Sequence, residues 1–149
     1  MAQPVITIAR TYDKAFIDSM LISLAEDITT DQHSLPTAEQ VLALPDCIAI
    51  GVYLDGVLTG LGILDGETIH TLFPPAIRGG MAVKAAKKAV AWIWETTCLK
   101  HIVSYAFSNR PEVLLFARLA GFKVISHNDW GDTIKGVPVT RYTLISNRI

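Results

Sequence analysis

An almost uncharged stretch, residues 47–64, constrains the fold of this chain of 149 residues more than any other segment. Its single charged residue is Asp55, and Gly56 follows directly. Asp-Gly between two apolar, β-branched runs favours a hairpin with a two-residue turn, because both turn positions need a positive φ. A membrane-spanning helix needs about 20 apolar residues without such a break. The stretch is therefore predicted to form two antiparallel strands, residues 48–54 and 57–64.

Further strands are predicted on both sides of this hairpin. Asp65-Gly66 is a second tight turn, so residues 67–73 continue the antiparallel meander. A short β-branched strand at residues 5–9 precedes it, and residues 101–107 suit a pleated sheet. The last two strands are expected at residues 123–126 and 141–146, with a polar loop between them.

The helices are predicted from their caps and their apolar spacing. Asp13 begins a helix over residues 13–25, and Thr37 with Gln40 has the spacing of a capping box for a short helix ending near residue 44. A long helix covers residues 81–97. The last helix is expected to have Asn109 at its cap, to end at residue 120 and to be followed by Gly121 in a left-handed conformation.

This order of elements predicts a mixed α/β fold. The meander is antiparallel, but the long helix before strand 101–107 forces a parallel neighbour. We expect about seven strands with helices on both faces, forming one domain over residues 1–149. A chain of this length buries roughly 70% of the surface that its unfolded form exposes, which suffices for a core.

Composition excludes some classes of protein. The net charge of −1 gives no electrostatic footprint for nucleic acid. Only 18% of residues are charged, against about 25% in typical soluble domains, so we expect apolar surface covered by a partner or by another copy of the chain. The start of the chain has no secretory pattern, which predicts a cytoplasmic protein without a membrane segment. Cys47 and Cys98 are then expected to be reduced, buried thiols, and no metal-binding spacing is found.

The junction before the long helix resembles the GNAT superfamily of N-acetyltransferases, and the resemblance covers nearly the whole chain. In that family a loop of the form Gln/Arg-x-x-Gly-x-Gly/Ala holds the pyrophosphate of coenzyme A on backbone N–H groups. Here Gly80 and Ala82 match, but Ile77 stands at the first position and Arg78 comes one residue late. Glycines and a helix N-terminus suit an anion on physical grounds. The alternative for Gly79-Gly80 is a plain flexible turn.

The resemblance implies a site for acetyl-coenzyme A. Its expected residues include backbone groups of Leu72 and Phe73 for the pantetheine arm, and the full set is Leu72, Phe73, Arg78, Gly79, Gly80, Met81, Ala82, Asn109 and Phe116. The family's catalytic Tyr stands seven residues after the Asn, and Phe116 occupies that position. A phenyl ring has no proton for the leaving thiolate. Asn109 has the alternative of a plain helix cap.

A general base is expected on the strand 67–73, where the candidates are His70 and Glu67. Alternation places Thr68, His70 and Leu72 on one face, and Glu67 on the other. The alternative for His70 is a structural histidine. His33 borders the usual acceptor site of the family, with a solvated loop residue as the alternative.

Two functional interpretations stay open. The first is an enzyme that transfers acetyl from acetyl-coenzyme A to an unidentified amine. The second is a GNAT-fold protein of a tailed phage, located in the virion or active in head assembly, which acts by protein binding. Arg78-Gly79-Gly80-Met81-Ala82 before an Ala-rich helix that ends in Trp92 and Trp94 resembles such phage proteins. In that interpretation the partner is a phage structural protein, and the location is the host cytoplasm or the virion.

Trp130 is predicted to contact a partner or a second copy of the chain. It lies in the polar segment 126–138, where no periodicity assigns it to the core. Rigid aromatic side chains are the usual centres of protein contacts. The alternative is that Trp130 folds back on its own domain.

Overall fold

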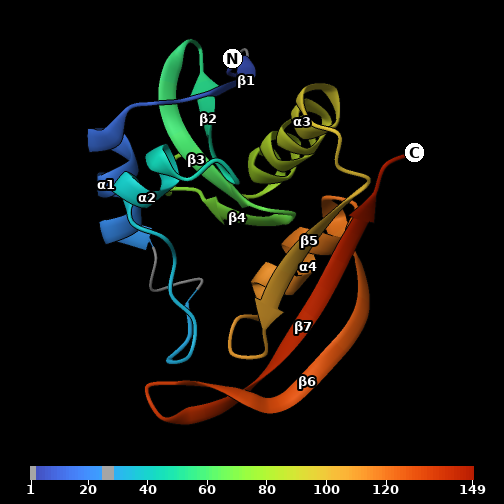
Figure 1. The fold of residues 1–149 in the computed structure, drawn as a ribbon. Coiled ribbons are helices and arrows are strands. Elements are labelled where there is room, and N and C mark those ends of the chain that lie inside the picture. The colour runs from blue at the N-terminus through green and yellow to red at the C-terminus, as the bar shows by residue number, and fades with distance from the viewer. Residues whose placement is uncertain (1–2, 25–28) are drawn as a thin grey trace.

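One mixed sheet organises the molecule (Figure 1). The computed structural model describes residues 3–24 and 29–149, and within them seven strands pair in the order β1-β2-β3-β4-β5-β7-β6. The strands are β1 (Ile6–Arg10), β2 (Cys47–Leu54), β3 (Val57–Asp65), β4 (Thr68–Leu72), β5 (His101–Phe107), β6 (Lys123–Ile134) and β7 (Val137–Asn147). The pair β4–β5 is parallel and the other neighbours are antiparallel. The predicted mixed α/β class is confirmed.

The turns and caps of the first half follow the sequence prediction. Asp55 and Gly56 have φ of 49° and 82°, so a positive φ at both positions closes the hairpin between β2 and β3. Asp13 accepts a hydrogen bond from the Phe16 N–H at 3.0 Å at the start of α1 (Lys14–Leu24). Thr37 completes its capping box at the start of α2 (Ala38–Ala43).

Helices cover both faces of the sheet, as predicted. On one face, α3 (Gly80–Thr96) and α4 (Pro111–Leu119) pack on a core that includes Ile69, Phe73 and Ile102. On the other face, α1 and α2 pack on a smaller core that includes Ile63 and Leu72. Figure 1 shows α1 and α2 over the first strands, while β5, β6 and β7 extend beyond them. Among residues 3–24 and 29–149, no helix therefore covers one face of the half of the sheet beyond β4.

The prediction of a polar loop between the last strands was wrong. β6 and β7 form one long hairpin that turns at Lys135 and Gly136, whose φ values are 50° and 80°. The polar residues of the supposed loop belong to β6, where the pairing register shifts between Asn128 and Asp132. Trp130 lies in this irregular part with a φ of 61° and an exposed fraction of 80%. An edge strand needs no apolar alternation on its solvent side, which is why the pattern gave no signal.

Two further predictions need correction. The cap of α4 is Arg110, which makes no side-chain capping bond to the backbone, so Asn109 does not cap the helix. The neighbouring Ser108 instead accepts a hydrogen bond through Oγ from the Thr140 N–H at 2.9 Å and so holds β7. Cys47 is buried as expected, but Cys98 is exposed because it lies in the connection after α3.

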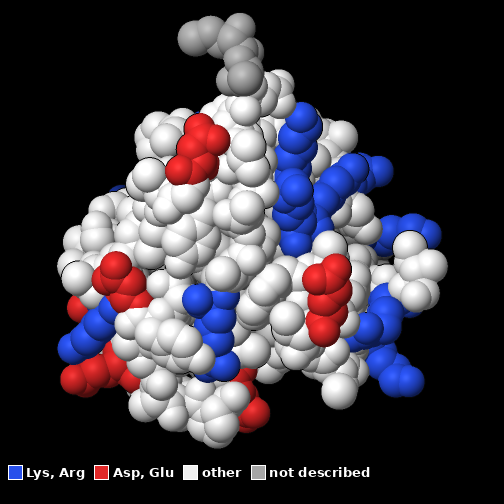
Figure 2. Space-filling view, turned by 90° about the horizontal axis from the view of Figure 1, so that it is seen from above, with Lys and Arg blue, Asp and Glu red and all other residues white. Residues whose placement is uncertain are grey.

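The surface reflects the low content of charge. Figure 2 shows a face that consists mostly of uncharged side chains, with Lys, Arg, Asp and Glu in small scattered groups. Exposed apolar side chains include Leu115 and Leu119 on α4 and Ile125 on β6. In the described part of the chain, every helix is too short or too polar to cross a lipid bilayer.

Candidate functional site

The site begins where the sheet opens between β4 and β5. Their ladder consists of the single pair Thr68–Val103, supported by a hydrogen bond of 2.7 Å from the Val103 N–H to the Glu67 carbonyl. Beyond this pair the two parallel strands diverge (Figure 1). A sheet that loses its ladder leaves space between the strands, and the structure uses this space for a cavity.

This central pocket has a volume of about 310 Å³. Toward α3 and α4 its wall is apolar, with Ile69, Phe73, Ala86, Ala89, Val90, Ile93, Val113, Phe116, Ala117, Ala120 and Phe122. The rest of its lining includes the polar side chains of His33, Ser34, Asp65, Thr68, His70, Ser104, Tyr105 and Arg141. The pocket therefore joins an apolar side to a polar side through the opening in the sheet.

His70 stands on the polar side of this pocket. Its ladder partner Ile63 and its second neighbour Leu72 both belong to the core under α1 and α2, so the predicted alternation on β4 is correct. Burial lowers the pKa of His70, and the negative charge of Asp65 partly opposes this effect. The imidazole is thus neutral at pH 7 and able to accept a proton.

Glu67 is not brought to the pocket. Its carboxylate lies 2.8 Å from His101 Nε2, at the closed end of the opening where β4 begins. Both side chains are about half exposed, and Glu67 does not line the central pocket. The geometry does not favour Glu67 as a base.

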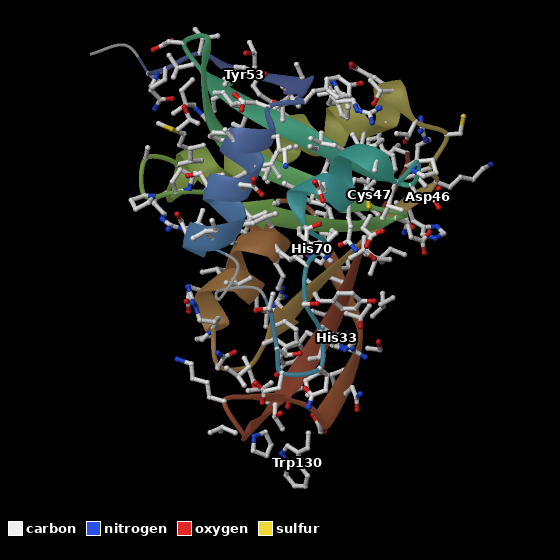
Figure 3. All side chains as sticks on the ribbon, turned by 60° about the vertical axis from the view of Figure 1, so that its left-hand side comes forward. His33, Asp46, Cys47, Tyr53, His70 and Trp130 are labelled. Atoms are coloured by element: carbon white, nitrogen blue, oxygen red, sulfur yellow. The ribbon has the colours of Figure 1, made fainter. Side chains whose placement is uncertain are left out.

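His33 is held at the pocket by the β6–β7 hairpin. Its Nε2 lies 3.2 Å from Asp132 Oδ1 and 3.2 Å from Arg141 Nη1. The loop that carries it is fixed to the hairpin at Asp31, whose carboxylate accepts hydrogen bonds from the Thr133 hydroxyl and from the N–H groups of 135 and 136. These bonds lower the pKa of Asp31. Figure 3 shows His33 below His70 at the junction of the two halves of the molecule, with Trp130 at the far tip.

A second pocket lies at the N-terminal end of α3, and we call it the helix-end pocket. Its volume is about 530 Å³. Of the residues expected to bind coenzyme A, it is lined by Leu72, Phe73, Arg78, Gly79, Gly80, Ala82 and Phe116. It shares Thr71, Phe73, Val113 and Phe116 with the central pocket, so the two cavities adjoin. The rings of Phe73 and Phe116 meet edge to face at 6.1 Å in this shared wall.

The backbone at this pocket is open to an anion. Gly79 is the N-cap of α3 with a φ of 61°, and no side chain caps the helix. The first N–H groups of a helix have no partner within the helix. A Cβ added to Gly80 would lie more than 4 Å from other described groups, apart from neighbours in the chain and the helix backbone. The first turn of α3 thus presents backbone donors and the positive end of a helix dipole to open space.

Two of the predicted binding residues lie elsewhere. Met81 points into a third hollow with Lys84 and Lys88 near the start of β1, and Asn109 lines neither the central nor the helix-end pocket. Asp65, Tyr105 and Arg141, which line the central pocket, are not among the residues predicted from the sequence. Their roles depend on pairing between strands far apart in the chain, and no local motif marks them.

The described residues contain no group of three or more His, Cys, Asp or Glu side chains able to hold a metal ion.

Comparisons with known proteins identify the fold. No protein-family model matches the chain, and no curated protein matches its sequence. Among solved structures, the spermidine N-acetyltransferase from Vibrio cholerae in complex with CoA and spermine is similar, with a TM-score of 0.78, 14% identity and coverage of 95% of each chain. The acetyltransferase of the GNAT family from Streptococcus pneumoniae has a TM-score of 0.73 and 12% identity, over 97% of this chain and 100% of that chain. The chain therefore has the fold of the GNAT acetyltransferases.

Proposed function

We propose that this protein is an N-acetyltransferase that uses acetyl-coenzyme A and an amine acceptor. One observation carries the proposal: the helix-end pocket adjoins a central pocket that passes through the opening between β4 and β5 and presents His70. A thioester arm and an amine can approach each other from opposite sides of such an opening. The similarity of fold to acetyltransferases supports the same activity.

The residues around the helix-end pocket fit the coenzyme. The N–H groups at the start of α3, next to Gly79 and Gly80, would hold the pyrophosphate, and Arg78 adds a positive charge at the same pocket. Leu72 and Phe73, at the end of β4, would pair with the pantetheine amides along a strand edge that β5 leaves open. The apolar wall shared with the central pocket excludes water from the arm. When bound, acetyl-coenzyme A supplies the acetyl group as a thioester.

His70 is the proposed general base. An amine must lose a proton before or during its attack on a carbonyl carbon, and a neutral imidazole in the pocket can accept that proton. Asp65 lines the same pocket and stabilises the imidazolium that results. Phe116 occupies the position of the family's catalytic Tyr and carries no exchangeable proton, so a general acid is absent from this position. Most of the rate enhancement then comes from positioning of the two reactants and from His70.

The alternative function is a phage virion or head-assembly protein that binds other proteins. Leu115, Ile125 and Trp130 are each more than half exposed, which favours a contact surface. This alternative needs no coenzyme, and the similar structures compared above are acetyltransferases. Binding of acetyl-coenzyme A therefore separates the two functions.

A thermal melt with and without acetyl-coenzyme A tests the proposal. At about 100 times its dissociation constant, a ligand adds roughly 2.7 kcal/mol to the free energy of unfolding. For a domain of this size we expect a rise in Tm of about 5–10 °C. Coenzyme A without the acetyl group should give a similar shift, and unrelated nucleotides without the pantetheine arm a smaller one. An unchanged Tm at millimolar acetyl-coenzyme A would exclude the enzyme and leave the binding protein.

A further inference from the structure

The polar side of the central pocket carries charges of opposite sign at its two ends. The register defines these ends. Asp65 pairs with Thr68 at the closed end, where β4 and β5 still touch. His70 and Tyr105 each follow that ladder pair by two residues along their strands. Arg141 pairs with Phe107, two residues further toward the open end.

These side chains share one face of the sheet. The buried residues of β5, Ile102 and Ala106, belong to the core under α3 and α4, so Tyr105 faces the other side, as His70 does. Arg141 is on the same side, because paired residues of antiparallel strands point the same way. At roughly 3.3 Å per residue, Arg141 lies about 7 Å beyond the level of His70 along the strands. Its guanidinium nevertheless lies over the Tyr105 ring, 5.2 Å from the centroid, and so reaches back toward His70.

The hydrogen bonds of Arg141 are incomplete. Its Nη1 lies 3.2 Å from His33 Nε2, but its buried Nε has no hydrogen-bond partner. Asp132, with an exposed fraction of 1%, lies behind it at 3.7 Å from Nε to Oδ2, which is too long for a hydrogen bond. Asp132 thus compensates the charge of Arg141 without using its N–H groups. A guanidinium presents five donors in a planar fork that matches a carboxylate.

We infer that the acceptor carries a carboxylate as well as an amine, as an amino acid does, and that Arg141 binds this carboxylate. The inference rests on the proposed function and names its acceptor class. The amine lies near His70 and Asp65, where its proton is removed, and the carboxylate points toward Arg141 at the open end. The pocket is small and also has to admit the thioester, so the acceptor is a small molecule. A polycation fits poorly, because its second ammonium group would face the guanidinium.

The first test uses the unaltered protein and compares matched acceptors. The probes are the twenty L-amino acids, their amides, and spermidine, each with acetyl-coenzyme A. Consumption of acetyl-coenzyme A is followed by chromatography, because the exposed Cys98 would react with thiol reagents. We expect at least one amino acid with a kcat/KM about tenfold or more above that of its amide. Amides or spermidine acetylated as well as every amino acid would overturn the inference and leave the proposed function intact.

The second test separates binding from structure at Arg141. Arg141→Gln should raise the KM for the amino acid about tenfold or more, with kcat changed less than threefold and the amide unaffected. Arg141→Lys keeps the charge without the fork and should give an intermediate KM. Arg118→Gln, on an exposed residue of α4 outside both pockets, is the control for loss of one positive charge. An equal loss with amino acids and amides would assign Arg141 a structural role and overturn the inference.

A failure of the proposed function gives a different pattern. In that case acetyl-coenzyme A neither binds nor is consumed with any acceptor. Ligand-observed NMR with the same amino acids and amides then tests the pocket directly. Binding of an amino acid but not of its amide, lost in Arg141→Gln, supports the carboxylate site. If neither the amino acids nor the amides bind, the inference is overturned.

Discussion

The helix-end pocket and the polar side of the central pocket are built in different ways. The first comes mainly from short local segments, residues 71–83 and the first turns of α4. The second brings together side chains from β3, β4, β5, β7 and the loop at His33. A local segment fixes its own geometry through glycines and a helix end, whereas the polar wall depends on strand register. The parts that bind a common coenzyme can thus be local, while those that select an acceptor are assembled over the whole sheet.

The largest expected effect concerns the polar side of the central pocket, which is assembled from distant strands. His70→Gln keeps the approximate size of the side chain but removes the base, so kcat should fall by about 10²–10⁴-fold. The affinity for acetyl-coenzyme A should stay within about twofold, because His70 does not line the helix-end pocket. Steady-state kinetics and calorimetric titration of both proteins measure the two quantities. Full activity of His70→Gln would contradict the assignment of the base.

The pKa of His70 also predicts a pH dependence. Burial lowers this pKa below its ordinary value of 6.5, so the acid limb of kcat/KM should have its midpoint below pH 6.5. The unfolded chain binds a proton more readily than the folded one, and the free energy of unfolding therefore falls as the pH drops below about 6.5. In urea melts between pH 7 and pH 5, the free energy of unfolding should therefore fall less in His70→Gln than in the wild type. A larger fall in the variant would contradict a lowered pKa of His70.

The next effect concerns the helix-end pocket, which is built from local segments. Gly80→Glu should weaken the binding of acetyl-coenzyme A at least tenfold, or about 1.4 kcal/mol, because a carboxylate at the helix end repels phosphate and blocks the approach to the backbone. Gly80→Ala is the matched control, because space is available for its Cβ. Calorimetric titration should give the control an affinity close to the wild type. Unchanged affinity of Gly80→Glu would exclude this helix end as the pyrophosphate site.

A smaller effect is expected where the two pockets adjoin. Phe116→Tyr adds a hydroxyl in the wall shared by both pockets. If the hydroxyl reaches the arm of the coenzyme, thioester hydrolysis or acetyl transfer should rise, and the fold should remain intact. If Phe116 lies in a closed core, the buried hydroxyl would instead lower the free energy of unfolding by about 1–3 kcal/mol. A urea melt beside an activity assay distinguishes the two, and strong destabilisation without a gain would show that Phe116 does not border an open channel.

The sequence was most informative where local chemistry decides the structure. Asp55-Gly56 and Asp65-Gly66 fix the meander, and the capping box at Thr37 fixes the start of α2. Gly80 and Ala82, which the sequence predicts to bind coenzyme A, line the helix-end pocket. In each case the signal is a residue type whose backbone or capping preference acts within a few residues, so a linear sequence contains it in full.

The sequence did not predict the structure where contacts between distant segments determine it. β6 was missed beyond residue 126, because its polar residues are satisfied by β7 and by Asp31 more than 100 positions earlier in the chain. Arg141 was not predicted as a site residue, because neither its pairing with Phe107 nor its contact with His33 can be inferred before the strand register is known. Side chains that select an acceptor in this way can be identified only in the folded sheet.

The smallest expected effect on the fold is that of Trp130→Ala. Trp130 lies in the irregular part of β6 with an exposed fraction of 80%, so little burial is lost when the ring is removed. The free energy of unfolding should change by less than about 0.5 kcal/mol. This exposure does not fit the alternative in which the ring packs onto its own domain. Contact with a partner or a second copy of the chain stays a prediction.

Self-association is the quantity that Trp130→Ala should alter. An aromatic side chain that becomes fully buried in a protein contact contributes about 2 kcal/mol or more, which corresponds to a change of roughly 30-fold in a dissociation constant. Light scattering over a range of concentrations, beside a urea melt, measures both effects. Tyr12→Ala is the matched control, because Tyr12 is also exposed but lies just after β1, the strand at the opposite edge of the sheet. If Trp130→Ala and Tyr12→Ala leave the mass and its concentration dependence equally unchanged, the exposed part of β6 around Trp130 is not a contact between copies of this chain.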